Sequence, residues 1–233
     1  MKAVVMQPTY LSWMGYFDLI DQSDIFVFLD DVQFEKQSWQ QRNKIKTPQG
    51  WQWLSIPVVK KFPQLIKDVQ ISNNIGWAKI HWKTIVQNYE KAPAFANYKD
   101  AFEHIYSKNW DKLADLNMAL IKLICDVLGI KKDFIRSSDI NVPGDKVVKL
   151  VNICHKINAT TYLSPVGSAG YIEEDNRFKS EGITLEYHNY EFPRYSQLYG
   201  EYVPYLSVVD LLFNCGESAL GIIKKGRASA GKG

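Results

Sequence analysis

The chain has 233 residues and a formal net charge of +3, and 46% of its residues are hydrophobic. This length can form one large domain with a substantial core or two small domains, and the composition is that of an ordinary globular protein. Because the net charge is small and the lysines are scattered, charge alone does not indicate nucleic acid or an acidic membrane surface as a partner.

The first 30 residues predict a strand, a short helix and a second strand. Residues 3–6 and 25–29 are apolar runs typical of buried strands, and residues 15–22 carry apolar side chains at helical spacing. A crossover helix of about ten residues fits a right-handed βαβ unit with a parallel strand pair. Two further strands are predicted at 51–59 and 66–71.

Helical patterns then dominate, and strands return in the second half. Helices are predicted at 77–89, 97–106, 113–128 and 146–157, strands at 135–138, 160–163 and 183–187, and a last apolar segment at 206–213. The predicted fold class is α/β, with a mainly parallel sheet core, flanking helices and a helical insertion near residues 76–130. We expect a single domain over residues 1–223 and a flexible polar tail over residues 224–233.

The three cysteines, Cys125, Cys154 and Cys215, lie in apolar stretches without Cys-x-x-Cys spacing. They are therefore expected to be reduced core residues. The chain shows no signal-peptide pattern and no run near the 18 apolar residues of a membrane span. These features predict a cytoplasmic protein without membrane insertion.

Polar and aromatic side chains gather where the first two predicted strands end. The segment Gln7 to Phe17 follows the first strand, Asp30-Asp31-Val32-Gln33 follows the second, and Trp39 to Asn43 comes shortly afterwards. Ligands of open α/β sheets bind beyond the carboxyl ends of the strands. Charges buried among these aromatic residues would be costly unless they meet each other or a ligand. We therefore predict one ligand site at this end of the sheet.

These motifs resemble the WbqC-like family of bacterial proteins, whose opening reads QPxYLPWLGYF, followed by a DDVQ segment and a W-x-x-RN segment. Ser12 stands where the family usually has proline, and Gln41 where it usually has asparagine. The similarity covers nearly the whole chain and continues at Trp77, His81, Tyr89, 128–130, 162–165 and 206–210. The resemblance implies a role in making surface polysaccharides such as O-antigen lipopolysaccharide, by decorating a nucleotide-linked amino sugar.

The N-terminal motif supplies candidate substrate-binding residues. Gln7 can both donate and accept hydrogen bonds, and Tyr10 and Trp13 offer flat faces for stacking. Arg42 and Asn43 suit an anionic group, because a guanidinium binds phosphate or carboxylate in a bidentate manner. The alternatives are a rigid aromatic loop packed on the sheet and an ion pair between Arg42 and one of the aspartates.

Three residues are candidates for catalysis: His81, Asp31 and Asp30. Strand alternation points the two aspartates to opposite faces, so a dyad sharing one proton is not expected. One of them could bind a sugar diol, an amine or Mg²⁺, and the other could pair with Arg42. His81 could accept a proton from an attacking amine near neutral pH, although a lone helical histidine is more often structural. No histidine pair has metal-ligand spacing, and no metal site is predicted.

Further substrate-binding candidates lie in the matched motifs and after a later strand. Gln33, Trp39 and Tyr89 belong to the matched motifs. Ser164 and Ser168 flank a glycine after the strand at 160–163, where hydroxyl and backbone N–H groups could hold a phosphate or oxyanion. A plain tight turn explains these two serines equally well.

The function predicted from these residues is acyl or aminoacyl transfer to the amine of a nucleotide-linked sugar. No nucleophile elbow is present, which favours direct attack of the amine on an activated donor, such as an acyl thioester. The alternatives are an ATP- and Mg-dependent ligase of the nucleotidylyltransferase type and a sugar-pathway binding protein without catalysis. The expected partner is a nucleotide-linked sugar or other small molecule rather than nucleic acid, and a homodimer is left open.

Overall fold

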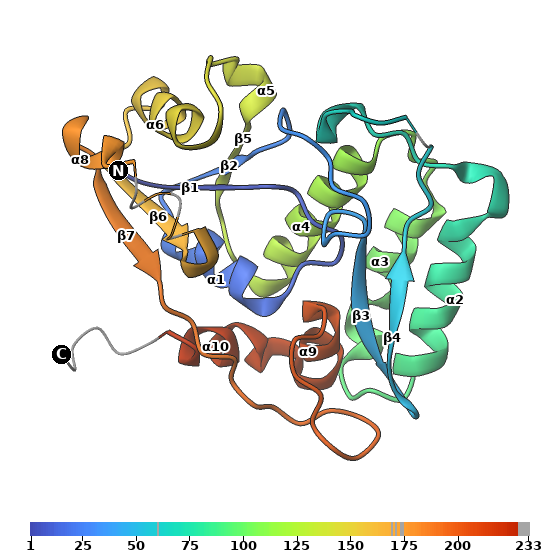
Figure 1. The fold of residues 1–233 in the computed structure, drawn as a ribbon. Coiled ribbons are helices and arrows are strands. Elements are labelled where there is room, and N and C mark those ends of the chain that lie inside the picture. The colour runs from blue at the N-terminus through green and yellow to red at the C-terminus, as the bar shows by residue number, and fades with distance from the viewer. Residues whose placement is uncertain (60, 169, 171, 173–174, 228–233) are drawn as a thin grey trace.

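The computed structural model describes residues 1–59, 61–168, 170, 172 and 175–227, and within them five strands form a parallel sheet (Figure 1). In their spatial order the strands are β5 (Asp133–Arg136), β2 (Ile25–Phe28), β1 (Lys2–Met6), β6 (Thr161–Pro165) and β7 (Thr184–His188). Neighbouring strands of this sheet pair in parallel. The predicted α/β class, with a mainly parallel sheet and flanking helices, is confirmed.

The order of the strands places a switch in direction at the centre of the sheet. From β1 the chain proceeds through β2 to β5, and it then returns to the other side of β1 to add β6 and β7. The order therefore reverses between β1 and β6. In open α/β sheets this is the position where a ligand crevice forms, beyond the carboxyl ends of the strands.

Helices cover both faces of the sheet because side chains alternate along each strand. Val4 and Phe26 belong to the larger core, with residues of α1 (Met14–Gln22) and α4 (Leu113–Leu128). Val5 and Val27 belong to a second core on the opposite face, with residues of α6 (Lys146–Lys156) and α8 (Arg177–Ser180).

A separate hairpin and the helices α2 (Trp77–Tyr89), α3 (Phe95–Ser107) and α4 lie between β2 and β5 in the chain. The hairpin consists of β3 (Arg42–Thr47) and β4 (Gly50–Ser55), which pair antiparallel outside the main sheet (Figure 1). Helix α2 packs against β3, and α3 packs against α2 and α4. The sequence missed β3. The strand predicted at 66–71 is wrong: Ile66–Asp68 is a 3₁₀ turn, and only isolated bridges pair this stretch with other residues.

The later elements also differ in detail from the expected ones. The strand predicted at 135–138 ends at Arg136, and the short helix α5 (Ser137–Ile140) begins at the next residue. The apolar segment at 206–213 largely forms α9 (Val208–Cys215), which is followed by α10 (Ala219–Lys225). The Ser207 Oγ caps α9 by accepting a hydrogen bond from the backbone N–H of Val209 at 3.3 Å. Among the described residues, no helix has the length and apolar character needed to cross a membrane.

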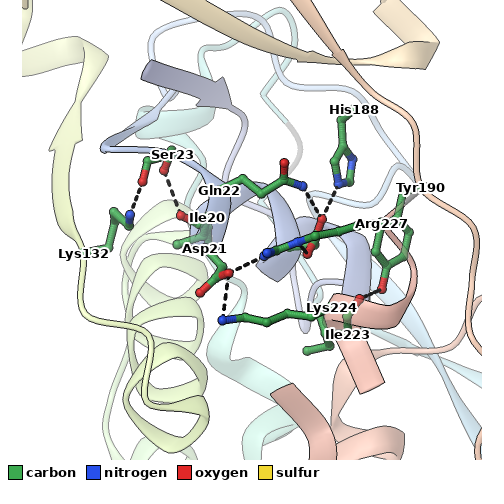
Figure 2. Close-up of polar contacts among 11 residues, drawn as sticks. Ile20, Asp21, Gln22, Ser23, Lys132, His188, Tyr190, Ile223, Lys224 and Arg227 are labelled. Atoms are coloured by element: carbon green, nitrogen blue, oxygen red, sulfur yellow. Dashed lines mark hydrogen bonds and ion pairs between the residues drawn. The ribbon is translucent and has the colours of Figure 1, made fainter. Parts of the chain in front are cut away.

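A cluster of charges attaches the end of the described chain to α1. Arg227 donates through Nε to Asp18 Oδ1 at 2.8 Å and also contacts Asp21, while His188 Nε2 lies 2.8 Å from Asp18 Oδ2 (Figure 2). Burial by itself raises the pKa of Asp18, but the hydrogen bonds from His188, Arg227 and Gln22 outweigh it and lower the pKa below its usual value.

These contacts move the start of the expected tail. Lys224 and Lys225 are the last residues of α10, and Lys224 Nζ lies 3.2 Å from Asp21. The expected tail over residues 224–233 therefore begins inside helix α10. Residues 226 and 227 are also described, and residues 228–233 lie outside the described part of the chain.

Candidate functional site

A cleft of about 930 Å³ opens beyond the carboxyl ends of β1, β2 and β6. This is the switch point of the sheet, and the volume lies within the usual range of small-molecule sites. Five of the residues predicted for the site line this cleft: Gln7, Trp13, Asp31, Gln33 and Trp39. The cleft is also lined by four residues that were not among the site candidates: Gln40, Lys146, Lys149 and Tyr162.

An ion pair sits in the wall of the cleft. Lys149, in the first turns of α6, places Nζ 2.7 Å from Oδ2 of Asp31, and the two side chains are only 10% and 12% exposed. The Ser137 hydroxyl donates to the other carboxylate oxygen, Oδ1. Two donors from different elements therefore hold the Asp31 carboxylate in one position beside the cleft.

A chain of amide hydrogen bonds orients Gln7 at the end of β1. The buried Gln40 accepts through Oε1 from the backbone N–H of Glu35 at 3.1 Å, so its Nε2 is the donor to Gln7 Oε1 at 2.8 Å. The other end of the Gln7 amide, Nε2, has no protein acceptor among the described residues. Gln7 can therefore present an N–H donor to a ligand in the cleft.

Tryptophan side chains form another wall of the cleft. The rings of Trp13 and Trp39 lie 6.2 Å apart, and Trp39 is 42% exposed. The loops that carry them are fastened together, because Tyr10 N–H donates to the Trp39 carbonyl at 3.0 Å. Asn117 of α4 donates through Nδ2 to the carbonyls of Pro8, at 3.1 Å, and Gln40, at 2.8 Å. Hydrogen bonds to the backbone of these loops therefore hold the wall in place before any ligand binds.

Asp30 has a different environment from its neighbour, and its expected catalytic role does not fit the structure. Its side chain is fully buried, and Oδ2 lies 2.8 Å from both Nε and Nη2 of Arg136. Ser138 donates its backbone N–H to Oδ1 at 3.0 Å and its hydroxyl to Oδ2 at 2.9 Å. Because these donors satisfy the carboxylate, Asp30 fixes β2 to the start of α5. Its cationic partner is Arg136 rather than the expected Arg42.

His81 and Tyr10 also lie away from the cleft, contrary to the expected roles as base and stacking platform. Tyr10 is fully buried, and its hydroxyl lies 2.9 Å from His81 Nδ1 and 2.6 Å from the Tyr106 hydroxyl. Burial lowers the pKa of His81 to about 4, although a backbone hydrogen bond with Ser55 opposes the change. His81 is thus a neutral, internally bonded histidine near pH 7, and we assign it a structural role.

We also assign structural roles to Asn43 and Tyr89, because both are buried and their polar atoms bond to other parts of the protein. Asn43 is fully buried and donates through Nδ2 to the Leu11 carbonyl at 2.7 Å, which ties β3 to the N-terminal loop. The Tyr89 hydroxyl accepts from the backbone N–H of Lys46 at 2.9 Å and donates to Asp210 at 2.9 Å. Asp210 is buried, and burial raises its pKa despite hydrogen bonds from Tyr195 and Tyr89.

Arg42 is the expected anion-binding residue, and the structure places it beside the cleft rather than in its wall. Its guanidinium carbon lies 4.2 Å from the centre of the Trp53 ring. Its Nε is enclosed and has no hydrogen-bond acceptor within the described part of the chain. Arg42 starts β3 directly after the Trp39 loop, so it remains close in sequence to the cleft wall.

The two serines after β6 give no support for a phosphate loop. Ser164 is buried, and its hydroxyl donates to the Pro165 carbonyl at 3.3 Å. Ser168 ends a 3₁₀ turn, and its side chain lies outside what the structure describes. Within the described residues, no group of three or more His, Cys, Asp or Glu side chains is arranged to hold a metal ion.

The comparisons with known proteins agree with the motifs. The chain matches the WbqC-like protein family over residues 7–222, and it belongs to this family. It is also 38% identical, over 94% of its length and 95% of the relative, to a Mycobacterium tuberculosis protein described as "Uncharacterized protein Rv1507c". No solved structure matches the chain.

Proposed function

We propose that this member of the WbqC-like family transfers an acyl or aminoacyl group to the amine of a nucleotide-linked sugar, in the synthesis of a bacterial surface polysaccharide such as O-antigen. The observation that carries the proposal is the position of Asp31. Its carboxylate is held by Lys149 and Ser137 at the edge of a cleft whose other walls present tryptophan rings and the Gln7 amide.

Such a cleft suits the ring of an amino sugar. The apolar face of a pyranose packs against an indole, as Trp13 and Trp39 allow, while hydroxyl groups need donors and acceptors at the rim. Gln7 provides a fixed donor because Gln40 occupies its oxygen. Asp31 provides an acceptor for the amine of the sugar.

The chemistry assigned to the cleft is direct acyl transfer. The amine nitrogen attacks the carbonyl carbon of an acyl thioester, the C–N bond forms, and the C–S bond breaks with release of the thiolate. The nitrogen must lose one proton as the bond forms, and in this proposal Asp31 accepts it. Lys149 keeps the carboxylate oriented through their ion pair. It is a positioning residue, since its Nζ already bonds Asp31.

The test uses purified protein, UDP- and dTDP-linked amino sugars and a panel of acyl thioesters, with products identified by mass spectrometry. We expect a sugar nucleotide heavier by one acyl group, and little product from Asp31→Asn. Asp100→Asn, at an exposed carboxylate on α3, is the matched control. Product that forms only with ATP and with release of AMP or diphosphate would indicate a ligase instead. Retention of the sugar nucleotide without turnover would indicate a binding protein.

A further inference from the structure

A row of tryptophans and cations runs along the outer face of the β3–β4 hairpin. Trp39 lies 5.7 Å from Trp53, and Trp53 lies 5.8 Å from Trp51, measured between ring centres. Arg42 lies over the Trp53 ring, and Lys44 Nζ lies 4.1 Å from the centre of Trp51. We call these five residues the tryptophan row. Its four hairpin residues share one face because strand side chains alternate, while Asn43, Ile45 and Leu54 on the other face are buried. Trp39 precedes β3 and joins the row through its contact with Trp53.

The positive charge of the tryptophan row is not neutralised by the protein. Within the described part of the chain, neither Arg42 nor Lys44 forms an ion pair with a carboxylate. Both rest on indole rings, which attract a cation without removing its charge. An anionic ligand placed here would gain two charge-assisted contacts and would displace no internal partner.

The tryptophan row is continuous with the cleft. Trp39 belongs to both, because it lines the cleft and also contacts Trp53. Beyond it come Arg42 and Lys44, two residues apart on β3 and therefore separated by about 7 Å along the strand. Trp51 lies at the far end of the row and is 45% exposed. A ligand that extends out of the cleft would thus meet two cations and then the exposed part of the Trp51 indole.

From this order we infer that the tryptophan row binds the nucleoside diphosphate half of the substrate. The two phosphates contact Arg42 and Lys44, and the base stacks on Trp51, while the attached sugar reaches back past Trp39 into the cleft. The Arg42 guanidinium and Lys44 Nζ lie 4.2 and 5.1 Å from the centre of the same Trp53 ring, so a diphosphate beside this ring can contact both cations. Base stacking on an exposed indole does not depend on the base. This inference rests on the proposed function only in taking the sugar to be nucleotide-linked.

The experiment measures binding of UDP, dTDP and GDP to the whole protein by calorimetry and by quenching of tryptophan fluorescence. Arg42→Gln and Lys44→Gln should each weaken binding roughly ten- to hundredfold, since each removes a charged hydrogen-bond donor. Trp51→Ala should weaken it roughly tenfold. Lys79→Gln, at an exposed lysine on α2, is the control for the change in charge and should bind as the wild type does.

Several results would overturn the inference. Equal affinity for UDP in wild type and in the three row variants would place the nucleotide elsewhere. If pyrophosphate binds as tightly as UDP, the base contributes nothing to the affinity and does not stack on Trp51. A neutral oligosaccharide or a thymidine oligonucleotide could bind more tightly than UDP and lose affinity in the row variants. The tryptophan row would then be a binding site for a polymer instead of a nucleoside diphosphate. Arg42→Lys keeps the charge but not the bidentate geometry. If this variant unfolds at the same temperature as the wild type, its weaker binding reflects the lost bidentate contacts and not misfolding.

The outcomes separate this inference from the proposed function. Acyl transfer to an amino sugar by protein that does not bind nucleoside diphosphates would refute the inference and leave the transferase intact. Row-dependent UDP binding without acyl transfer would support the inference and leave the transferase unsupported. The binding assay needs no acyl donor, so a wrong choice of donor does not affect it.

Discussion

Asp30 and Asp31 are neighbours in the chain, and both carboxylates lie within hydrogen-bond distance of the Ser137 hydroxyl, yet they lie in different surroundings. Asp30 is fully buried against Arg136. Asp31 faces the cleft beside Lys149. One carboxylate is therefore assigned to the fold and the other to the site, and the two can be tested separately.

Asp31→Asn should remove activity and also cost stability. If Asp31 accepts the proton of the attacking amine, acyl transfer should fall roughly 10²–10⁴-fold. The free energy of unfolding should fall by about 3 kcal/mol, because the variant leaves Lys149 largely buried without its anion. The double variant Asp31→Asn/Lys149→Gln should regain part of this stability but none of the activity. Urea denaturation and product formation measure the two effects, and transfer at the wild-type rate in Asp31→Asn would contradict the assignment.

Asp30→Asn should affect stability and leave ligand affinity unchanged in protein that remains folded. Removing the charge leaves the Arg136 guanidinium short of its buried partner, which should lower the free energy of unfolding by about 3–5 kcal/mol. Asp139→Asn, at an exposed carboxylate on the adjacent helix α5, is the matched control. Denaturation and calorimetry with a sugar nucleotide provide the measurements. A stable Asp30→Asn protein that no longer binds the ligand would return Asp30 to the site.

His81 should make stability depend on pH. Its pKa is about 4 in the folded protein and near 6.5 in the unfolded chain, so the unfolded state binds the proton first. The contribution is fully present above pH 6.5, is lost as pH falls from about 6.5 to about 4, and amounts to about 3 kcal/mol. Urea midpoints across this range should fall less steeply in His81→Gln than in the wild type. The rate of acyl transfer should depend on pH in the same way in both proteins. If the wild-type rate rises with pH near pH 6.5 and this rise is absent in His81→Gln, His81 is the catalytic base after all.

Arg227→Gln should loosen the C-terminal segment. The substitution removes contacts to Asp18 and Asp21 and leaves Asp18 with His188 and Gln22, so the free energy of unfolding should fall by about 1–3 kcal/mol. Lys225→Gln, which removes an exposed charge two residues earlier, is the control. Limited proteolysis should release residues after α10 faster in Arg227→Gln than in the control. Identical protection in both variants would show that the cluster in Figure 2 does not hold this segment.

Local patterns in the sequence were sufficient for much of the fold. The apolar runs at 3–6 and 25–29 became β1 and β2, and the long helical pattern at 113–128 became α4. The stretch at 66–71 was predicted wrongly because its apolar residues face the core from a 3₁₀ turn and from isolated bridges rather than from a strand. The strand β3 was missed because three of its six residues are cations and Ile45 is its only aliphatic residue, a composition that resembles a surface loop.

The sequence by itself placed a site at the ends of the first two strands, because parallel strands carry their carboxyl ends to the same edge of a sheet. It could not decide which side of each loop faces the cleft. Asp30 and Asp31, or Tyr10 and Trp13, are equivalent candidates until burial and partners are known. Lys149 carries no signal in the sequence that separates it from other lysines. Only the packing of α6 against the end of β2 brings its ammonium group to Asp31, and contacts between residues so far apart in the chain are decided by tertiary structure.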